Sequence, residues 1–270
     1  MVGVKDSEWV ALREDDGRAY LLQKKPGEIK IKGLGRFDAN QLLDGFSVGD
    51  RIKVGQKSLT IVNAALPEAR RNMFRRAQTI GIKDSGFLLS WMGIGVGSRV
   101  LEGGHGSAGI AMHLANVLGE KGTLISVEIR EEHAQVGKQN MDRLKEILPE
   151  FPDWHLLVGD LIDAGDKVKS ICGNIDAAII DMAEPWTVVD SIIPTLRIGG
   201  RIACYCPTTS QLEKSWNACE EAGLEIEWAG EMIERKWSKA SKGGVRPGNQ
   251  PMGHTAFLII AAKIASEEEE

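Results

Sequence analysis

The sequence predicts an α/β protein with a mainly parallel, doubly wound sheet and a small β-rich unit at its N-terminal end. From residue 98 onward, apolar strand-like segments alternate with stretches of helical spacing, which is the order of βαβ units. Residues 8–62 instead hold short apolar or alternating runs between turns such as Asp-Asp-Gly and Pro-Gly, which is typical of antiparallel strands. We expect the β-rich unit at 1–65, the α/β domain at 66–266 and an acidic tail at 267–270.

Composition excludes several classes of protein. The chain has 270 residues and is 43% hydrophobic, so we expect a large hydrophobic core. Its formal net charge is -5, so we do not expect a protein that binds nucleic acid through its overall charge. The first residues lack the layout of a secretory signal, and no stretch reaches the roughly 18 apolar residues of a membrane span. We therefore expect a cytoplasmic protein with no membrane partner. The 4 cysteines and 5 histidines show no ligand spacing, which predicts free thiols and no metal.

Two basic clusters stand out against this acidic balance. Arg70, Arg71, Arg75 and Arg76 share one short segment, and a second cluster occupies residues 235–246. The second cluster consists of Arg235, Lys236, Lys239, Lys242 and Arg246. Such clusters occur on nucleic-acid-binding surfaces and also on solvated helix faces and loops, so both interpretations stay open.

The strands and helices of the α/β region follow from hydrophobic patterning. The segment 131–148 places Ala134, Met141, Leu144 and Leu148 on one helical face. Ser107 stands where the N-cap of an earlier helix is expected. Apolar runs that fit a sheet covered on both faces predict strands. They lie at 98–104, 122–129, 155–161, 175–182, 200–207, 224–234 and 255–263.

The turn after the first of these strands, in RVLEGGHGSAG, contains three closely spaced glycines. Ligands of open α/β sheets bind beyond the carboxyl ends of the strands, so Gly103, Gly104 and Gly106 are where a cofactor is expected. A phosphate-binding loop has a lysine followed by Ser or Thr after its last glycine, whereas Ser107 and Ala108 follow here. Tight packing of a strand against a helix, without a ligand, is the alternative interpretation.

Acidic residues stand at four successive strand ends. Glu128 follows the glycines at a spacing of roughly 20 residues, where a carboxylate can accept from both ribose hydroxyls. Asp160 can accept from an adenine amine, and Asp181 ends the next strand. Glu102 would repel a pyrophosphate and favour a cationic amino-acid group. Each acid alone fits a helix cap or a solvated loop, but the ordered set predicts one crevice with S-adenosylmethionine as the cofactor.

Several segments together carry a resemblance to a known family. They are RRAQTIGIKDSGFLLSWMGI, RVLEGGHGSAGIAMHLA, ISVEIREEHAQVGKQNMDR, VGDL, IIDMAEPW, CYCPTTSQ and MGHTAFL. The series resembles the tRNA (adenine-58-N1)-methyltransferase family in its single-subunit archaeal and bacterial form, and the Asp-x-x-Glu-Pro-Trp and Gly-His-Thr motifs are its most specific parts. The resemblance implies a class I methyltransferase fold with a seven-stranded sheet, S-adenosylmethionine as cofactor, tRNA as substrate and assembly as a homotetramer.

The resemblance also implies a role for individual residues. Asp181 matches the catalytic carboxylate, which would accept from the exocyclic amine of adenine and stabilise the charge that develops on the ring. The cofactor would contact Gln78, Glu102, Gly103, Gly104, His105, Gly106, Ser107, Glu128, Ile129, Asp160, Leu161 and Asp181. The substrate would contact Arg70, Arg71, Arg75, Arg76, Glu184, Pro185, Trp186, Thr208, Gln211 and His254.

Three positions depart from the family pattern. His105 stands where threonine is usual, Gly81 where tyrosine is usual, and Ala183 replaces a proline in the Asp-x-x-Glu-Pro-Trp motif.

The sequence leaves three hypotheses for the function. The first is a tRNA methyltransferase for N1 of adenine 58, with adenine 57 as a further target. The second is a non-catalytic RNA-binding subunit of the same fold, and the third is a class I methyltransferase for a protein or small molecule.

Overall fold

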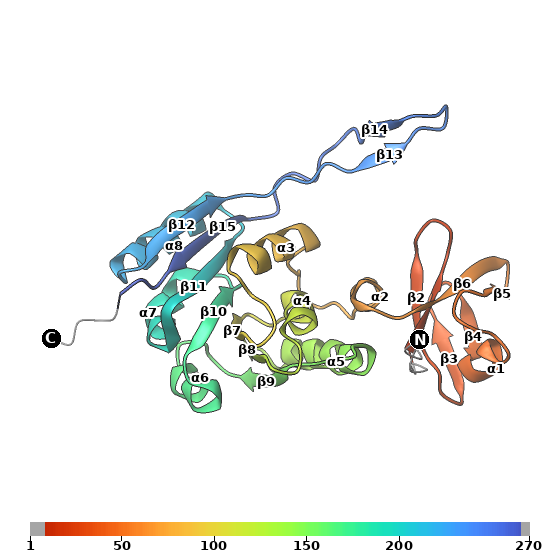
Figure 1. The fold of residues 1–270 in the computed structure, drawn as a ribbon, viewed down its shortest axis with the longest axis horizontal. Coiled ribbons are helices and arrows are strands. Elements are labelled where there is room, and N and C mark those ends of the chain that lie inside the picture. Colours follow the sequence, from red (N-terminus) through yellow and green to blue (C-terminus); the bar gives the residue numbers. More distant parts are fainter. Residues whose placement is uncertain (1–8, 266–270) are drawn as a thin grey trace.

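The computed structural model describes residues 9–265, so the expected acidic tail at 267–270 lies outside the described residues. A small N-terminal group of strands lies beside a larger α/β body, and a long hairpin extends from that body (Figure 1). Helix α2 (Leu66–Arg71) lies in the connection between the two groups, where the sequence predicts the junction.

The N-terminal part is antiparallel, as the turn-rich pattern predicts. Its four-stranded sheet has the order β2-β1-β6-β5, and a separate hairpin pairs β3 with β4. Asp38 caps a short helix by accepting from Gln41 N–H, a feature that the hydrophobic pattern does not predict. The elements are β1 (Trp9–Arg13), β2 (Ala19–Gln23), β3 (Glu28–Ile31), β4 (Gly35–Asp38), α1 (Ala39–Leu43), β5 (Arg51–Val54) and β6 (Lys57–Asn63).

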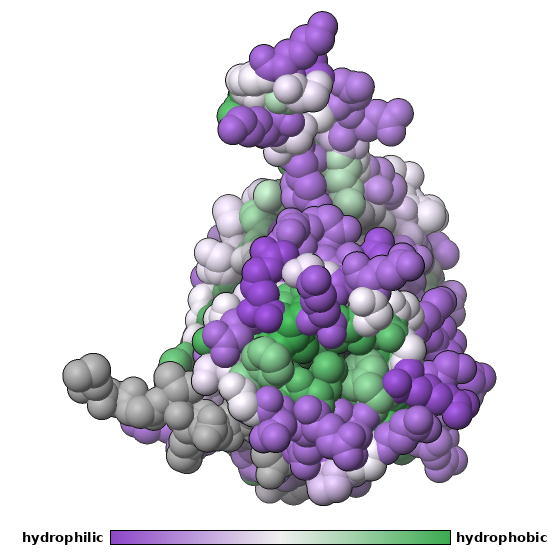
Figure 2. All heavy atoms as spheres, turned by 90° about the vertical axis from the view of Figure 1, so that its right-hand side faces the viewer, coloured by the Kyte–Doolittle hydropathy of each residue, from purple (hydrophilic) through white to green (hydrophobic). Residues whose placement is uncertain are grey.

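This N-terminal part has its own hydrophobic core, in which Leu12, Leu22 and Leu59 are fully buried. Figure 2 shows its outer face, where apolar surface gathers within a hydrophilic rim. The other side is attached to the α/β body, because the Trp9 indole N–H donates to Glu146 of helix α5, Glu131–Ile147 (2.6 Å). Trp9 and Leu21 belong to the core of the body rather than to the N-terminal core.

The body is a seven-stranded sheet, as the resemblance implies. Its order is β12-β15-β11-β10-β7-β8-β9, and only β15 runs antiparallel to its neighbours. Every strand predicted in this region is present, so the doubly wound prediction is confirmed. The strands are β7 (Arg99–Gly103), β8 (Thr123–Glu128), β9 (Asp153–Val158), β10 (Ile175–Ile180), β11 (Leu196–Cys206), β12 (Glu225–Gly230) and β15 (Phe257–Ala262).

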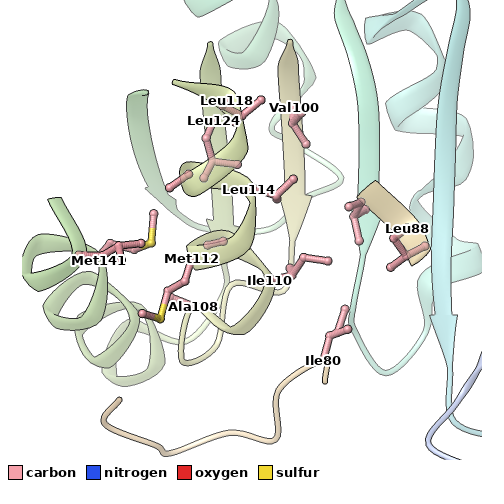
Figure 3. Close-up of a cluster of buried hydrophobic side chains, with 14 of the residues drawn as sticks. Ile80, Leu88, Val100, Ala108, Ile110, Met112, Leu114, Leu118, Leu124 and Met141 are labelled. Atoms are coloured by element: carbon pink, nitrogen blue, oxygen red, sulfur yellow. The ribbon is translucent and has the colours of Figure 1, made fainter. Parts of the chain in front are cut away.

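Helices cover both faces of this sheet because alternate strand residues point to opposite sides. Val100 packs with α4, as Figure 3 shows for Leu114 and Leu118 of that helix, whereas the next residue, Leu101, belongs to the core on the other face. The first face carries α2, α3 (Ile82–Trp91), α4 (Gly109–Leu118) and α5 (Glu131–Ile147). The second face carries α6 (Gly165–Cys172), α7 (Val189–Ile192) and α8 (Thr209–Glu221), with 3-10 turns η1 (Pro185–Val188) and η2 (Ile193–Thr195).

Two local expectations are corrected. Ser107 is not an N-cap, because α4 begins at Gly109 and its cap is Ala108 in a left-handed conformation (φ 64°). The strand expected to reach residue 234 ends at Gly230. The chain then forms a hairpin arm of β13 (Trp237–Lys239) and β14 (Val245–Pro247), which extends from the body and carries the second basic cluster (Figure 1).

Candidate active site

A pocket of about 610 Å³ lies at the carboxyl ends of the parallel strands. It lies where the strand order reverses between β7 and β10, the usual ligand position in open α/β sheets. The structure brings ten of the sequence-predicted site residues to its walls. They are Arg76, Gln78, Gly104, Gly106, Glu128, Ile129, Asp160, Leu161, Asp181 and Gln211.

Gly104 lets the two central strand ends approach each other. It has a φ of 85°, and a Cβ at this position would lie 1.9 Å from the carbonyl oxygen of Asp181. On the other side, the Asp181 N–H donates to the Gly103 carbonyl (2.8 Å). The glycine turn therefore joins β7 to the loop after β10, and any larger residue at position 104 would push Asp181 away from the pocket.

Glu128 is buried at the end of β8 and is oriented by backbone amides. Its Oε2 accepts from Gly106 N–H (2.8 Å), and its Oε1 accepts from Arg130 N–H (3.0 Å). Burial alone would raise the pKa of Glu128, but these amides and the Arg130 guanidinium hold it below its ordinary value. The carboxylate is therefore ionised at neutral pH and has lone pairs that face the pocket.

The pKa of Asp181 is shifted in the opposite direction from that of Glu128. Burial, followed by the charges of Glu102 and Glu128, raises the pKa of Asp181 to about 7. A carboxyl group with this pKa exchanges its proton near neutral pH, as a general base requires.

Another wall of the pocket, formed after β8 and β9, combines an acidic residue with apolar side chains. Asp160 is exposed after β9, and its Oδ1 accepts from Ile162 N–H (3.1 Å). Ile129 is 64% exposed at the pocket wall, and Leu161 lies on the same wall. An apolar surface beside an acceptor suits a flat heterocycle that carries an amine.

Four of the expected cofactor residues do not line this pocket. Glu102 and His105 lie behind its floor and border a smaller cavity of about 10 Å³ together with Gln78 and Asp181. Gly103 and Ser107 are buried in the strand and turn. The Ser107 hydroxyl accepts from the backbone N–H groups of Arg76 (3.0 Å) and Ala77 (3.1 Å), so it holds the preceding loop over the pocket.

The expectation for Arg70 is corrected. Its guanidinium donates to the carbonyls of Gly109 and Ile80 and is buried, so it is not available to a substrate phosphate. Burial, and secondarily Arg75, lowers the pKa of Arg70 to about 10. The other three members, Arg71, Arg75 and Arg76, are exposed.

The loop after β10 contributes different residues from those expected. Met182 and Ala183 line the pocket, whereas Glu184, Pro185 and Trp186 do not. Pro185 is buried, and Lys214 of α8 lies over the Trp186 ring, with its Nζ 4.5 Å from the ring centroid. The pocket lining therefore uses the two residues just after Asp181, and the Pro-Trp pair packs against α8.

Thr208 and the pocket-lining Gln211 hold the pocket rim in place. Thr208 and Gln211 form a capping box at the start of α8, and the Gln211 side-chain amide donates to Ala183 O (2.9 Å). His254 lies outside the pocket between Glu231 (3.0 Å from Nδ1) and the carbonyl of Pro207 (2.9 Å from Nε2). Hydrogen bonds to Pro207 and Glu231 raise the pKa of His254 above its ordinary value.

Besides Met182 and Ala183, six pocket residues were not selected from the sequence. Arg130 is the one that the sequence could have indicated, because it lies two residues after Glu128. The others lie in the loop after α2, in β8, in α5 and in the loops after β9 and β11. They are Ala77, Val127, His133, Gly159 and Pro207. Within residues 9–265, no helix is long and apolar enough to cross a membrane, and no group of three or more acidic, Cys or His side chains could hold a metal ion.

The sequence of the chain is similar to those of known tRNA methyltransferases. A family model described as tRNA methyltransferase complex GCD14 subunit matches residues 64–243. The chain belongs to this family. A tRNA (adenine(57)-N(1)/adenine(58)-N(1))-methyltransferase TrmI from Methanocaldococcus jannaschii is 28% identical over 269 residues, 93% of each chain. A tRNA (adenine(58)-N(1))-methyltransferase TrmI from Thermus thermophilus is 29% identical over 249 residues, 92% of this chain and 94% of the relative.

Solved structures of this fold are similar over nearly the whole chain. A SAM-dependent O-methyltransferase from Thermotoga maritima has a TM-score of 0.78 at 27% identity, with 98% of this chain and 96% of that chain covered. A tRNA (m1A58) methyltransferase TrmI from Aquifex aeolicus has a TM-score of 0.73 at 22% identity, with 97% and 99% covered. The fold is that of class I methyltransferases, as the resemblance implies.

Proposed function

We propose that the protein transfers a methyl group from S-adenosylmethionine to N1 of adenine 58 in the T-loop of tRNA, with adenine 57 as a further target. The observation that carries the proposal is the position of Asp181, which lines the pocket together with Glu128 and Asp160 at the carboxyl ends of the parallel strands. Membership of the family and the names of the relatives from M. jannaschii and T. thermophilus support the choice of substrate.

The residues present fit the cofactor. Glu128 would accept from the ribose hydroxyls, while Ile129 and Leu161 would cover the faces of the adenine and Asp160 would accept from its amine. Glu102 Oε1 is buried behind the glycine turn without a hydrogen-bond partner among the described residues, and a negative charge there suits the cationic end of the methionine part. When bound, S-adenosylmethionine supplies an activated methyl group on a sulfonium.

Asp181 would act on the substrate base. Its ionised carboxylate accepts a hydrogen bond from the exocyclic amine and so orients N1 toward the methyl donor. As N1 is alkylated, the ring becomes positively charged, and the nearby carboxylate stabilises that charge and receives the proton lost from the amine. The N1 atom lies on the Watson–Crick edge, so a stacked or paired adenine has to leave its stack before it enters the pocket.

The RNA would be held by exposed cations around the pocket. Arg71, Arg75 and Arg76 lie in or beside the loop over the pocket, and Arg76 reaches its wall. The basic cluster of the hairpin arm is mostly exposed as well. Phosphate contacts of this kind supply affinity without sequence readout, so recognition of the folded shape of tRNA is expected.

We also propose the wider setting of the enzyme. Residues 1–65 would serve as an RNA-binding or oligomerisation domain attached to a catalytic domain at 66–266. From the family resemblance we also expect a homotetramer in the cytoplasm. Light scattering of the purified protein measures its mass in solution and so tests the tetramer.

The experiment that tests the function is methyl transfer to unmodified tRNA, with the product located by nuclease digestion. The expected product is 1-methyladenine at position 58, and Asp181→Asn should lower the rate by about 100-fold to 10,000-fold. Calorimetry with S-adenosylmethionine should show that this variant still binds the cofactor. A parent protein that binds tRNA and cofactor but methylates no RNA would support the non-catalytic hypothesis instead, and methylation of a small molecule or protein would support the third.

A further inference from the structure

The hairpin arm begins and ends at the edge of the sheet that holds the pocket. Strand β15 is antiparallel to both β11 and β12, so the chain leaves the sheet after β12 and returns to it at the carboxyl ends of the parallel strands. The last residue of β11, Cys206, pairs with the first residue of β15, Phe257, and the pocket residue Pro207 follows Cys206. The base of the arm is therefore next to the pocket rim.

A buried cluster of Lys83, Asp84 and Thr255 joins both ends of the arm to helix α3. Lys83 Nζ donates to Asp84 Oδ1 (2.7 Å) and to Thr255 Oγ1 (2.6 Å). It also donates to the carbonyl of Met232 (2.7 Å), where the chain enters the arm. The Thr255 hydroxyl, where the chain returns, donates to Asp84 Oδ2 (2.8 Å). The Lys83 and Asp84 side chains are 9% and 0% exposed, so water competes little for these hydrogen bonds.

The first turn of α3 follows directly from the loop over the pocket. Residues 76–78 of this loop line the pocket, and α3 begins at Ile82. The returning end of the arm makes a second contact with the rim, because His254 Nε2 lies 2.9 Å from the Pro207 carbonyl oxygen. The base of the arm is thus joined at two separate points to the structure that lines the pocket.

The arm itself carries charge of one sign. All five cations of its basic cluster are exposed, and residues 235–265 contain no acidic residue. Trp237 and Val245, which are 64% and 67% exposed, share one face of the β13–β14 ribbon with Lys239. Positive charge beside an exposed aromatic ring suits a polyanion with unstacked bases, such as a loop of a folded RNA.

We propose that Lys83, Asp84 and Thr255 are positioning residues that fix the arm relative to the pocket, so that tRNA held by the arm presents its target adenine to Asp181. The proposal rests on the function proposed above. The arm supplies contacts to the RNA, and the cluster sets the direction and distance of those contacts from the pocket. Because a misplaced substrate reacts slowly even when it is bound, loss of the cluster should act on kcat.

The first test measures methyl transfer to unmodified tRNA. Thr255→Val nearly keeps the size of the side chain but removes the hydroxyl that contacts Lys83 and Asp84. It should lower kcat by about 10-fold to 100-fold and leave the KM for tRNA within about twofold of the parent value, because the bound RNA is misplaced rather than released. Thr255→Ser keeps the hydroxyl and should retain most of the rate. An unchanged kcat in Thr255→Val would overturn the proposal.

A double-mutant cycle separates this role from damage to the pocket. Three cations of the arm are replaced by glutamine, at Lys239, Lys242 and Arg246, which should weaken tRNA binding. In this background Thr255→Val should lower kcat/KM by less than about threefold, because the arm no longer holds the RNA that it directs. Thr195→Val, which removes a buried hydroxyl at the opposite edge of the sheet, is the matched control and should leave kcat within about twofold.

Two results of the cycle would overturn the proposal. One is an equal loss of kcat/KM with and without the arm cations. The other is a charge-neutralised arm that leaves tRNA affinity unchanged but lowers the mass of the protein in light scattering, which would assign the arm to contacts between copies of the chain.

A further measurement does not need activity. Spin labels at Ser241→Cys in the turn of the arm and at Gln139→Cys on α5 report the distance between arm and body, with Cys172→Ser as background because the other three cysteines are buried. The distance distribution should broaden in Thr255→Val and stay as narrow as the parent's in Thr195→Val. If the parent methylates no RNA, the proposed function fails while this measurement still decides whether the cluster fixes the arm. Equal widths in the parent and Thr255→Val would refute it.

Discussion

Asp181 should make the protein less stable at neutral pH than at acidic pH. Its pKa in the folded protein is about 7, whereas an unfolded aspartate has a pKa of about 3.9. Below about pH 4 the carboxyl group is protonated in both the folded and the unfolded state, so it does not make the free energy of unfolding depend on pH. Between about pH 4 and pH 7 the unfolded chain loses this proton and the folded protein keeps it, so stability falls as pH rises and is constant above about pH 7.

The size of the effect follows from the same two values. A difference of about 3 pH units corresponds to roughly 4 kcal/mol, and because the side chain faces an open pocket we expect about 1–3 kcal/mol. Asp181→Asn should therefore raise the free energy of unfolding by that amount at pH 8, and by about one third of it at pH 5. The same substitution should abolish most methyl transfer, so stability and activity would move in opposite directions.

Urea unfolding at pH 8 and pH 5 measures both values. Asp160→Asn, which changes an exposed carboxylate on the same pocket, is the control and should alter stability little at either pH. A new hydrogen bond made by the Asn amide would stabilise the protein equally at both pH values, so the pH dependence of the gain is the diagnostic quantity. If Asp181→Asn is no more stable than the parent at pH 8, or gains equally at both, the electrostatic account of this residue is wrong.

Three further predictions concern binding and the arginine cluster. Glu128→Ala should weaken S-adenosylmethionine binding by roughly 1.5–3 kcal/mol in calorimetry, because charge-assisted hydrogen bonds to the ribose are lost; unchanged affinity would remove Glu128 from the site. Replacing Arg71, Arg75 and Arg76 with alanine should weaken tRNA binding and reduce its dependence on salt, since fewer counterions are released; an unaltered slope would make them ordinary surface residues. Arg70→Ala should leave the salt slope unchanged but destabilise the protein by about 1–3 kcal/mol in urea, because two buried carbonyls lose their donor.

The sequence predicted the sheet well because its strands are long, apolar and regularly spaced. Buried segments such as Ile175–Ile180 must be covered on both faces, and the alternation with helices leaves few ways to do so. The short elements were harder. Helix α1 has five residues and depends on the Asp38 cap, and the turn of the hairpin arm depends on Gly243 and Gly244 at positive φ. Such features are decided by local hydrogen bonds and backbone angles that no periodicity reveals.

The site was predictable where backbone geometry fixes it. Strand ends of a parallel sheet meet at one edge, so Glu128, Asp160 and Asp181 had to lie near one another once the strands were known. Side-chain direction was not predictable in the same way. Arg70 and Arg71 are neighbours in a helix, yet one is buried against Gly109 and the other is exposed, because adjacent helical positions differ by about 100° in direction.

The glycine turn shows why a motif alone does not identify a ligand. Gly104 meets a packing requirement, because only a glycine lets the backbone approach that of Asp181 so closely. Gly106 donates its N–H to Glu128 and so orients a candidate ligand-binding group. The packing interpretation is therefore confirmed at Gly104, whereas binding of a ligand by this turn stays a prediction. A substitution at position 104 would displace Asp181, the proposed catalytic carboxyl group, through the backbone, and we expect it to impair catalysis without removing any side chain proposed to touch the cofactor.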